Sequence, residues 1–270
     1  AGPPPPQHRV GDDRRGVVTP TRAAGIDLSE WMEALEARHF ADLTFSEVAR
    51  SLRALSATYV ERRSTLATGA ALSGAGKRAA FALFYGPLHF LLVRHVVAAL
   101  SDPLGRTTTL VDLGCGTGAS GAGFHAARPT VSRVVGIDRH PWAIAQARDT
   151  WARAGLRAVL RVGDLVTTEW PAQSTLLLSF AVNELPSDAE RATLLQRLQS
   201  HRAAGGRVLV VEPLAGFVAP WWGRWASAVT AAGGRMDEWR LRADLPPLVA
   251  KLDRAAGLDH RELTGRSLCF

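Results

Sequence analysis

VDLGCGTGASG, residues 111–121, follows a short apolar run and places glycines at alternate positions just after an acid. Glycine allows a tight backbone turn and lets a ligand approach where a Cβ would collide. Two registers overlap in this stretch. Gly114, Gly116 and Gly118 alternate, whereas counting from Gly116 gives the spacing Gly-x-Gly-x-x-Gly, typical of dinucleotide-binding loops. The stretch is therefore predicted to hold a ligand with an adenosine end, in one of two registers.

The sequence after residue 106 alternates between short apolar runs and helical patterns. The apolar runs suit strands that are buried on both faces, and the alternation indicates a parallel sheet covered on both sides by helices. Strands are expected at 108–113, 133–138, 158–163, 174–180 and 207–213, and helices at 119–128, 141–154 and 187–203. A further helix near 244–256 and two closing strands within 258–270 complete the expected fold.

The first 106 residues lack this alternation of strand and helix patterns. Residues 1–25 contain a proline run and no periodicity, which predicts a flexible tail. Residues 26–106 are expected to form a helical cap, and residues 107–270 the α/β core. Within the cap, Asp27-x-x-Glu30 and Thr44-x-x-Glu47 have the spacing of capping boxes, which mark helix starts.

The most apolar helical region, 77–100, is expected to kink or split at Gly86-Pro87. Its length suits a membrane span, but the break and three polar side chains favour a buried helix of the fold, so no membrane contact is expected. The three are His89, Arg94 and His95. Tyr85, His89 and His95 are candidates for a lid over the glycine loop, with ordinary packing as the alternative.

Composition excludes several classes of protein. The hydrophobic content of 47% is ample for a packed core. The two cysteines, Cys115 and Cys269, exclude a disulfide framework, and no His/Cys/Asp grouping has metal-ligand spacing, so no metal is expected. The first residues lack the apolar core of a signal peptide, which favours a cytoplasmic protein.

The acids at the strand ends help to choose between the two registers. Asp112 would repel a pyrophosphate, yet it suits a ligand's ammonium group or a role in orienting the turn. Asp138 can accept ribose hydroxyls in either register, and Asp164 can reach an adenine amino group. These features favour S-adenosylmethionine, which carries an ammonium and no phosphate, over a dinucleotide.

VDLGCGTG, then GID, GDL, NELP and GGRVLVVEP, in this order, resemble the motifs of class I S-adenosylmethionine-dependent methyltransferases. The resemblance covers roughly residues 107–215 and implies a doubly wound, mostly parallel, seven-stranded Rossmann-like sheet. A nicotinamide dehydrogenase is the main alternative. Cys115 is interpreted as a small residue in the turn rather than a nucleophile. The resemblance implies cofactor contacts at Asp112, Gly114, Cys115, Gly116, Gly118, Asp138, Arg139, Asp164, Leu165 and Phe180.

Asn183 and Glu184 end the fourth predicted strand, where ligands bind in open α/β sheets. In the resembled family this position faces the transferring methyl group, which makes both residues the candidates for acceptor alignment and, for Glu184, proton removal. The alternative is that Glu184 caps or braces the following loop. Trp142 is well placed to lie against the adenine, and helix packing is its alternative.

A narrower resemblance concerns the small-ribosomal-subunit methyltransferase-like family. LRALSATYVERR at 52–63, the apolar segment before the glycine loop and the NEL at the fourth strand are similar to that family. It is associated with the ribosome, and many members carry a cysteine cluster thought to hold iron–sulfur. This chain lacks such a cluster because it has only two cysteines.

The charge distribution bears on the methyl acceptor. Residues 48–100 carry seven basic side chains and one acid, a net charge of +6, which makes RNA or a ribosomal particle slightly the favoured acceptor. Contacts with it are expected through Arg62, Arg63, Lys77 and Arg78. An arginine-rich coding bias explains the same charge. Two alternatives stay open: a small-molecule methyltransferase with an aromatic wall of Trp221, Trp222 and Trp225, and a non-catalytic, S-adenosylmethionine-binding ribosome-assembly factor.

Overall fold

The computed structural model describes residues 25–61, 72–214 and 219–270. Nearly all of the predicted tail, together with Arg62 and Arg63, lies outside the described residues.

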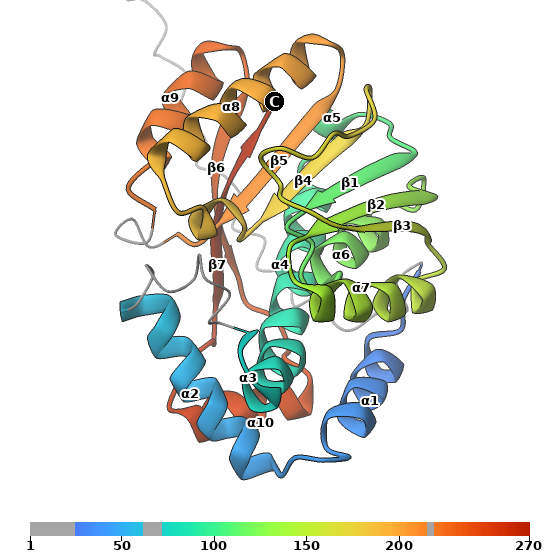
Figure 1. Ribbon diagram of the computed structural model, residues 1–270, viewed down its shortest axis with the longest axis vertical. Helices are drawn as coiled ribbons and strands as arrows, with labels where there is room; N and C mark the ends of the chain where they lie inside the picture. Colours follow the sequence, from blue (N-terminus) through green and yellow to red (C-terminus); the bar gives the residue numbers. More distant parts are fainter. Residues whose placement is uncertain (1–24, 62–71, 215–218) are drawn as a thin grey trace, which may run out of the picture.

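A seven-stranded sheet forms the centre of the molecule, with the strand order β3-β2-β1-β4-β5-β7-β6 (Figure 1). β7 runs antiparallel to both of its neighbours, and the other pairings are parallel. This arrangement confirms the expected doubly wound, mostly parallel sheet. The strands are β1 (Thr109–Leu113), β2 (Arg133–Asp138), β3 (Arg157–Val162), β4 (Thr175–Ser179), β5 (Arg207–Glu212), β6 (Arg235–Leu241) and β7 (Leu263–Cys269).

Side chains alternate along the central strands between two hydrophobic cores, because successive residues of a strand point to opposite faces. In β1, Leu110 enters the core beneath one helical layer, and Val111 and Leu113 enter the other. The first layer contains α4 (Gly86–Ala99), α6 (Ala119–Ala127) and α7 (Pro141–Arg153), and the second contains α8 (Asp188–Ala203) and α9 (Trp222–Ala231). The first core also takes in the N-terminal helices.

The expectation of two strands within residues 258–270 is wrong. That stretch supplies only β7, and its partner is β6, which lies before α10 (Pro247–Ala256). β6 is an edge strand with the sequence RMDEWRL, and most of its side chains are exposed or half-buried. Its charged residues hide the apolar signal on which the assignment of the buried strands depended.

The apolar region before the glycine loop forms one continuous run of helix: α3 (Ala75–Ala80), a π-helical turn η3 (Phe81–Tyr85) and α4. Gly86-Pro87 does not split it. The π-helical turn lies directly before the proline, and Gly86 N donates to Phe81 O with the wider i→i−5 spacing. The run is long and apolar enough to cross a membrane by length and composition, but 72% of its most apolar window is buried inside the fold.

The cap helices are α1 (Leu28–His39) and α2 (Phe45–Glu61), and a short helix, α5 (Ser101–Leu104), leads into β1. Asp27 caps α1 by accepting hydrogen bonds from Ser29 N and Glu30 N. Thr44 and Glu47 form the predicted reciprocal capping box. α10 lies beside α2 (Figure 1), so a C-terminal helix also contributes to this layer.

Gly118 illustrates how the glycine loop depends on its neighbours. It has φ +78° as the N-cap of α6, and a Cβ there would lie 2.9 Å from both the Ala147 Cα and the Trp151 Nε1. We expect Gly118→Ala to lower the free energy of unfolding by about 2–4 kcal/mol, because it adds backbone strain and overpacking. Urea denaturation measures this loss.

Gly223→Ala is the matched control, since Gly223 lies in α9 and a Cβ there would meet nothing within 4 Å. We expect it to change stability by less than about 1 kcal/mol. Equal losses in the two variants would contradict the packing account.

Candidate functional site

A cavity of about 420 Å³ opens at the carboxyl ends of the parallel strands. One half lies over β1, β2 and β3, and the other over β4, β5 and the start of β7. α2, η3 and α4 also contribute lining residues. The first half is lined by Gly114–Thr117, Asp138–His140 and Gly163–Leu165, and the second by Phe180, Ala181, Asn183–Leu185, Glu212, Pro213, His260 and Glu262–Thr264.

The glycine loop is tied to the end of β2 by backbone hydrogen bonds. Gly114 N and Cys115 N both donate to Ile137 O, at 2.8 and 3.1 Å. Gly116 N donates to Asp138 Oδ2 at 2.8 Å, and His140 N donates to Asp138 Oδ1 at 2.8 Å. The carboxylate therefore sets the distance between two loops, and its burial raises the pKa of Asp138.

Gly114 allows the close approach between the loop and the end of β4. Its φ is +72°, and a Cβ there would lie 2.6 Å from the Ala181 Cβ. Since the left-handed conformation also favours glycine, both the turn and the contact require this residue.

Asp164, at the third strand end, holds its own turn. Its Oδ1 accepts hydrogen bonds from Val166 N at 2.7 Å and Thr167 N at 3.2 Å. Arg139 lines the same half of the cavity and donates to the backbone oxygen of Glu184 at 3.3 Å. This contact links the loop after β2 to the segment after β4.

Phe180, the residue after β4, has φ +57°. A non-glycine residue in this conformation carries backbone strain, which is concentrated at functional sites. Its ring stacks on His89 at 4.1 Å between centroids, with 15° between the ring planes. Desolvation in this half-buried position lowers the pKa of His89 to about 3, so the imidazole is neutral.

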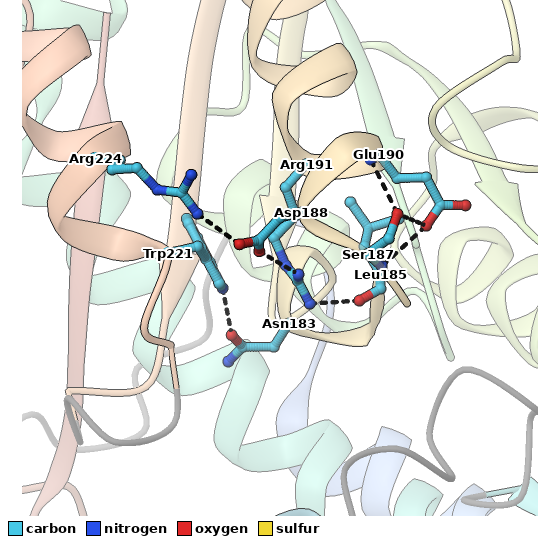
Figure 2. Close-up of polar contacts among 8 residues, drawn as sticks. All are labelled: Asn183, Leu185, Ser187, Asp188, Glu190, Arg191, Trp221 and Arg224. Atoms are coloured by element: carbon cyan, nitrogen blue, oxygen red, sulfur yellow. Dashed lines mark hydrogen bonds and ion pairs between the residues drawn. The ribbon is translucent and has the colours of Figure 1, made fainter.

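The segment after β4 is fixed from both sides. Val182 N donates to Glu212 Oε1 at 2.9 Å, and Trp221 Nε1 donates to Asn183 Oδ1 at 2.8 Å. The side-chain amide of Asn183 therefore has one orientation, with its oxygen toward the indole (Figure 2). Burial, and then the nearby Asp138, raise the pKa of Glu184 to about 7.

Figure 2 shows how the same segment joins α8. Ser187 and Glu190 form a reciprocal capping box at the start of α8. Arg191 donates to Leu185 O and pairs with Asp188, which also contacts Arg224 of α9 at 2.7 Å. The residues NELP are thus held by two helices rather than left as a free loop.

The comparisons with known proteins agree with this geometry. Residues 110–206 match a family described as methyltransferase domain. The chain carries a class I methyltransferase domain. S-adenosylmethionine is its cofactor, as the ordered motifs implied. A comparison with curated proteins finds no match.

Solved methyltransferase structures are similar to this chain. The mitomycin 7-O-methyltransferase MmcR is 18% identical, with a TM-score of 0.50, and the match covers 88% of this chain and 71% of that one. The N-methyltransferase NodS from Bradyrhizobium japonicum WM9, in complex with S-adenosyl-L-homocysteine, is 14% identical, with a TM-score of 0.45, over 65% of this chain and 84% of that one.

The cavity of the methyltransferase domain fits an adenosyl ligand. Each oxygen of Asp138 accepts one amide and keeps lone pairs for ribose hydroxyls, since a carboxylate has about four acceptor positions. The predicted residues that line the cavity are Gly114, Cys115, Gly116, Asp138, Arg139, Asp164, Leu165, Phe180, Asn183 and Glu184, joined by Tyr85 and His89.

Asp112 and Gly118 lie outside the cavity lining. The Asp112 carboxylate is buried beneath α6, where a Cβ on Gly121 would lie 2.7 Å from its Oδ2. This position keeps the carboxylate away from a ligand's ammonium in the cavity, and a role in orienting the turn stays a prediction. Gly118 serves the packing of α6 against α7, and Trp151 Nε1 donates to its carbonyl oxygen at 2.8 Å.

Several other candidates pack into the fold. His95 lies edge-on to Trp239, and Trp142 lies under the guanidinium of Arg78, with neither ring lining the cavity. Trp221, Trp222 and Trp225 are buried in the core beneath α8 and α9. They do not line the cavity, so they do not form the predicted aromatic wall of an acceptor site.

Four further lining residues were not among those predicted from sequence: Ser56, Glu212, His260 and Glu262. Glu212 ends β5 just as Asp138 ends β2, and this position was a usable signal. His260 and Glu262 lie in an irregular segment before β7, and only the antiparallel insertion of β7 brings them to this edge of the sheet.

Three carboxyl groups, two of them fully buried and Glu184 half-buried, make the stability of the cofactor-free protein pH-dependent. Burial raises the pKa of Asp112 to about 7, of Glu184 to about 7 and of Glu212 to about 8. The folded state then binds more protons than the unfolded state, so the free energy of unfolding falls as pH rises from about 5 to 8.

Asp112→Asn should flatten this fall by about 1–3 kcal/mol, since one pKa unit corresponds to about 1.4 kcal/mol. Urea denaturation at pH 5.5 and pH 8 measures the slope. The exposed Asp244→Asn is the control and should keep the wild-type slope. If the free energy of unfolding falls equally with pH in wild type and Asp112→Asn, the raised pKa of buried Asp112 does not contribute to the pH dependence.

Proposed function

We propose that the methyltransferase acts on a small neutral or cationic molecule that binds inside the cavity. The charge of the cavity carries this proposal. Five carboxylic acids line it, and Arg139 is the one arginine or lysine among the described lining residues. Burial raises the pKa of Glu184 and Glu212, so part of this wall is uncharged near neutral pH. A lining with a single arginine offers no cluster of cations to a phosphate backbone and suits an acceptor without negative charge. The five acids are Asp138, Asp164, Glu184, Glu212 and Glu262.

The cover of the cavity supports the same proposal. Ser56 from α2, Tyr85 from η3 and Leu92 from α4 line it beside the strand ends. The cavity is mainly apolar, with a few convergent polar groups, and its volume lies in the range of small-molecule sites.

The described basic residues within 48–100 lie away from the cavity. Arg78 Nε donates to Leu72 O at 2.9 Å, and the Arg94 guanidinium lies 5.5 Å from the centroid of the Phe90 ring. Arg50 and Arg53 are exposed on α2. Of the seven basic residues in 48–100, none of the five that the structure describes lines the cavity.

The chain's own contribution to the reaction is alignment and exclusion of water. When bound, S-adenosylmethionine supplies an electrophilic methyl group. Asn183 and Glu184 lie at the end of β4, where they can orient the acceptor toward that group. Trp221 holds the side-chain amide of Asn183, and Arg139 holds the backbone oxygen of Glu184. The stacked pair His89–Phe180 excludes water from the same place.

Calorimetric titration with S-adenosylhomocysteine tests the cofactor half, with NADH as the control ligand. We expect S-adenosylhomocysteine to bind and Asp138→Ala to weaken its binding at least 10-fold, because the variant loses both the ribose acceptor and the tie to Gly116. Asp244→Ala, an exposed aspartate, should bind like wild type. Binding of NADH instead would contradict the assignment.

Transfer of a radiolabelled methyl group tests the acceptor class. Purified small ribosomal subunits, phenol, catechol and benzylamine are supplied as separate acceptors. We expect label in a small molecule and none in RNA. Labelled RNA whose yield falls when Arg50 and Arg53 are replaced together by Gln would instead establish the RNA-directed function that the charge of the sequence favoured.

A further inference from the structure

His260 lines the half of the cavity that lies over β4, β5 and the start of β7, here called the acceptor half, and it pairs with Asp253 of α10. His260 Nδ1 lies 2.6 Å from Asp253 Oδ1, and His260 N donates to Asp253 Oδ2 at 3.1 Å. One carboxylate therefore fixes both the backbone and the ring of His260. The side chain of Asp253 is 11% exposed, and that of His260 is 32% exposed.

This geometry selects one tautomer of the imidazole. A carboxylate facing Nδ1 favours a proton on that nitrogen, which leaves Nε2 with a free lone pair. The ring of Phe84 packs edge-on against His260, with 5.2 Å between centroids, and limits its rotation. The pair thus presents an oriented proton acceptor.

The topology places this acceptor opposite the cofactor loop. β7 is antiparallel to β5, so its first residues lie at the carboxyl edge of the sheet, where Glu212 pairs with Arg266. His260 precedes β7 by three residues and lines the same cavity as Gly114 and Phe180. Ring contacts link His260 through Phe84, Tyr85 and His89 to Phe180.

Glu184 is less well placed for the same task. Its carboxyl interacts with Asp138 and Arg139 of the cofactor half as well as with Glu212 of the acceptor half, so it lies between the two halves. Its backbone oxygen also accepts a hydrogen bond from Arg139. Among the described residues that line the acceptor half, His260 is the imidazole held by a carboxylate.

We propose that the acceptor is a hydroxyl compound, such as a phenol, and that His260 Nε2 removes its proton during methyl transfer. The oxygen lone pair forms the new bond to the methyl carbon as the carbon–sulfur bond breaks. That electron pair neutralises the sulfonium, the proton remains on His260, and S-adenosylhomocysteine leaves. Asp253 is a positioning residue. This inference rests on the proposed function, because it needs a small acceptor in the cavity.

The aromatic lining suits a phenol. Phe81, Tyr85 and Phe180 offer ring faces and edges to a planar acceptor. Tyr85 hydrogen bonds with Ser56, and burial raises its pKa to about 12, so it stays protonated.

Initial rates of methyl transfer to catechol and phenol, with benzylamine as the amine probe, test the proposal. General-base catalysis typically contributes about 10²–10⁴-fold. We therefore expect His260→Gln to lower kcat with an oxygen acceptor about 100-fold or more, with little change in KM. Asp253→Asn should lower kcat about 10-fold. His95→Gln, outside the cavity, is the matched control and should act like wild type.

The pH profile separates catalysis from structure. Groups near His260 that also titrate are Asp253 on α10, Asp259, Arg261 and Glu262 on its own segment, Tyr85 on η3, and the cavity acids Glu184 and Glu212. In wild type we expect kcat to rise as an imidazole loses its proton. This rise should disappear in His260→Gln and shift in Asp253→Asn. NMR of ¹⁵N-labelled histidine should show the proton on Nδ1.

S-adenosylhomocysteine binding should be unchanged in all three variants, and circular dichroism confirms that they fold. If the wild-type protein does not bind S-adenosylhomocysteine, the proposed function itself is overturned. Four results would each overturn this inference while leaving the cofactor assignment intact. They are label on benzylamine or RNA only, label on neither catechol nor phenol, an unchanged rate in His260→Gln, and a proton on Nε2 of His260.

Discussion

The carboxylate of Asp138 accepts a hydrogen bond from the glycine loop after β1 and another from the start of α7. These two bonds fix the cofactor half of the cavity, because they hold Gly116 and His140 on either side of one strand end. The same oxygens retain acceptor positions for a ribose. A single side chain thus shapes the site and is available to contact the ligand.

Glu212 has the corresponding role in the acceptor half. It is fully buried and holds Val182, while Trp221 holds the next side chain, Asn183. Arg266 faces Glu212 across the β5–β7 pairing, and its guanidinium lies 4.3 Å from the centroid of the Trp222 ring. Together with Asp138 and Asp164, Glu212 shows a common device: a strand-end acid binds backbone amides and so orders the loop beside it.

The motifs from the glycine loop to the fifth strand could be predicted from sequence, because glycine spacing, apolar runs and strand-end acids are local signals. The edge strand β6 could not, since its exposed side chains remove the apolar pattern. His260 was missed for a different reason. Its place in the cavity follows from the reversed direction of β7, a tertiary feature with no counterpart in the residues around it. The ribosomal association suggested by the N-terminal segment is not supported by the comparisons, and the cavity lining does not favour an RNA acceptor.

The division of the cavity into two halves is tested most directly by a crystal structure of the complex with S-adenosylhomocysteine. The ribose should contact Asp138, the adenine should lie near Asp164 and Leu165, and the sulfur should point toward Phe180 and Asn183, leaving the surface of His260 open. A ligand seated against Glu212 and His260, with Asp138 uncontacted, would contradict the account.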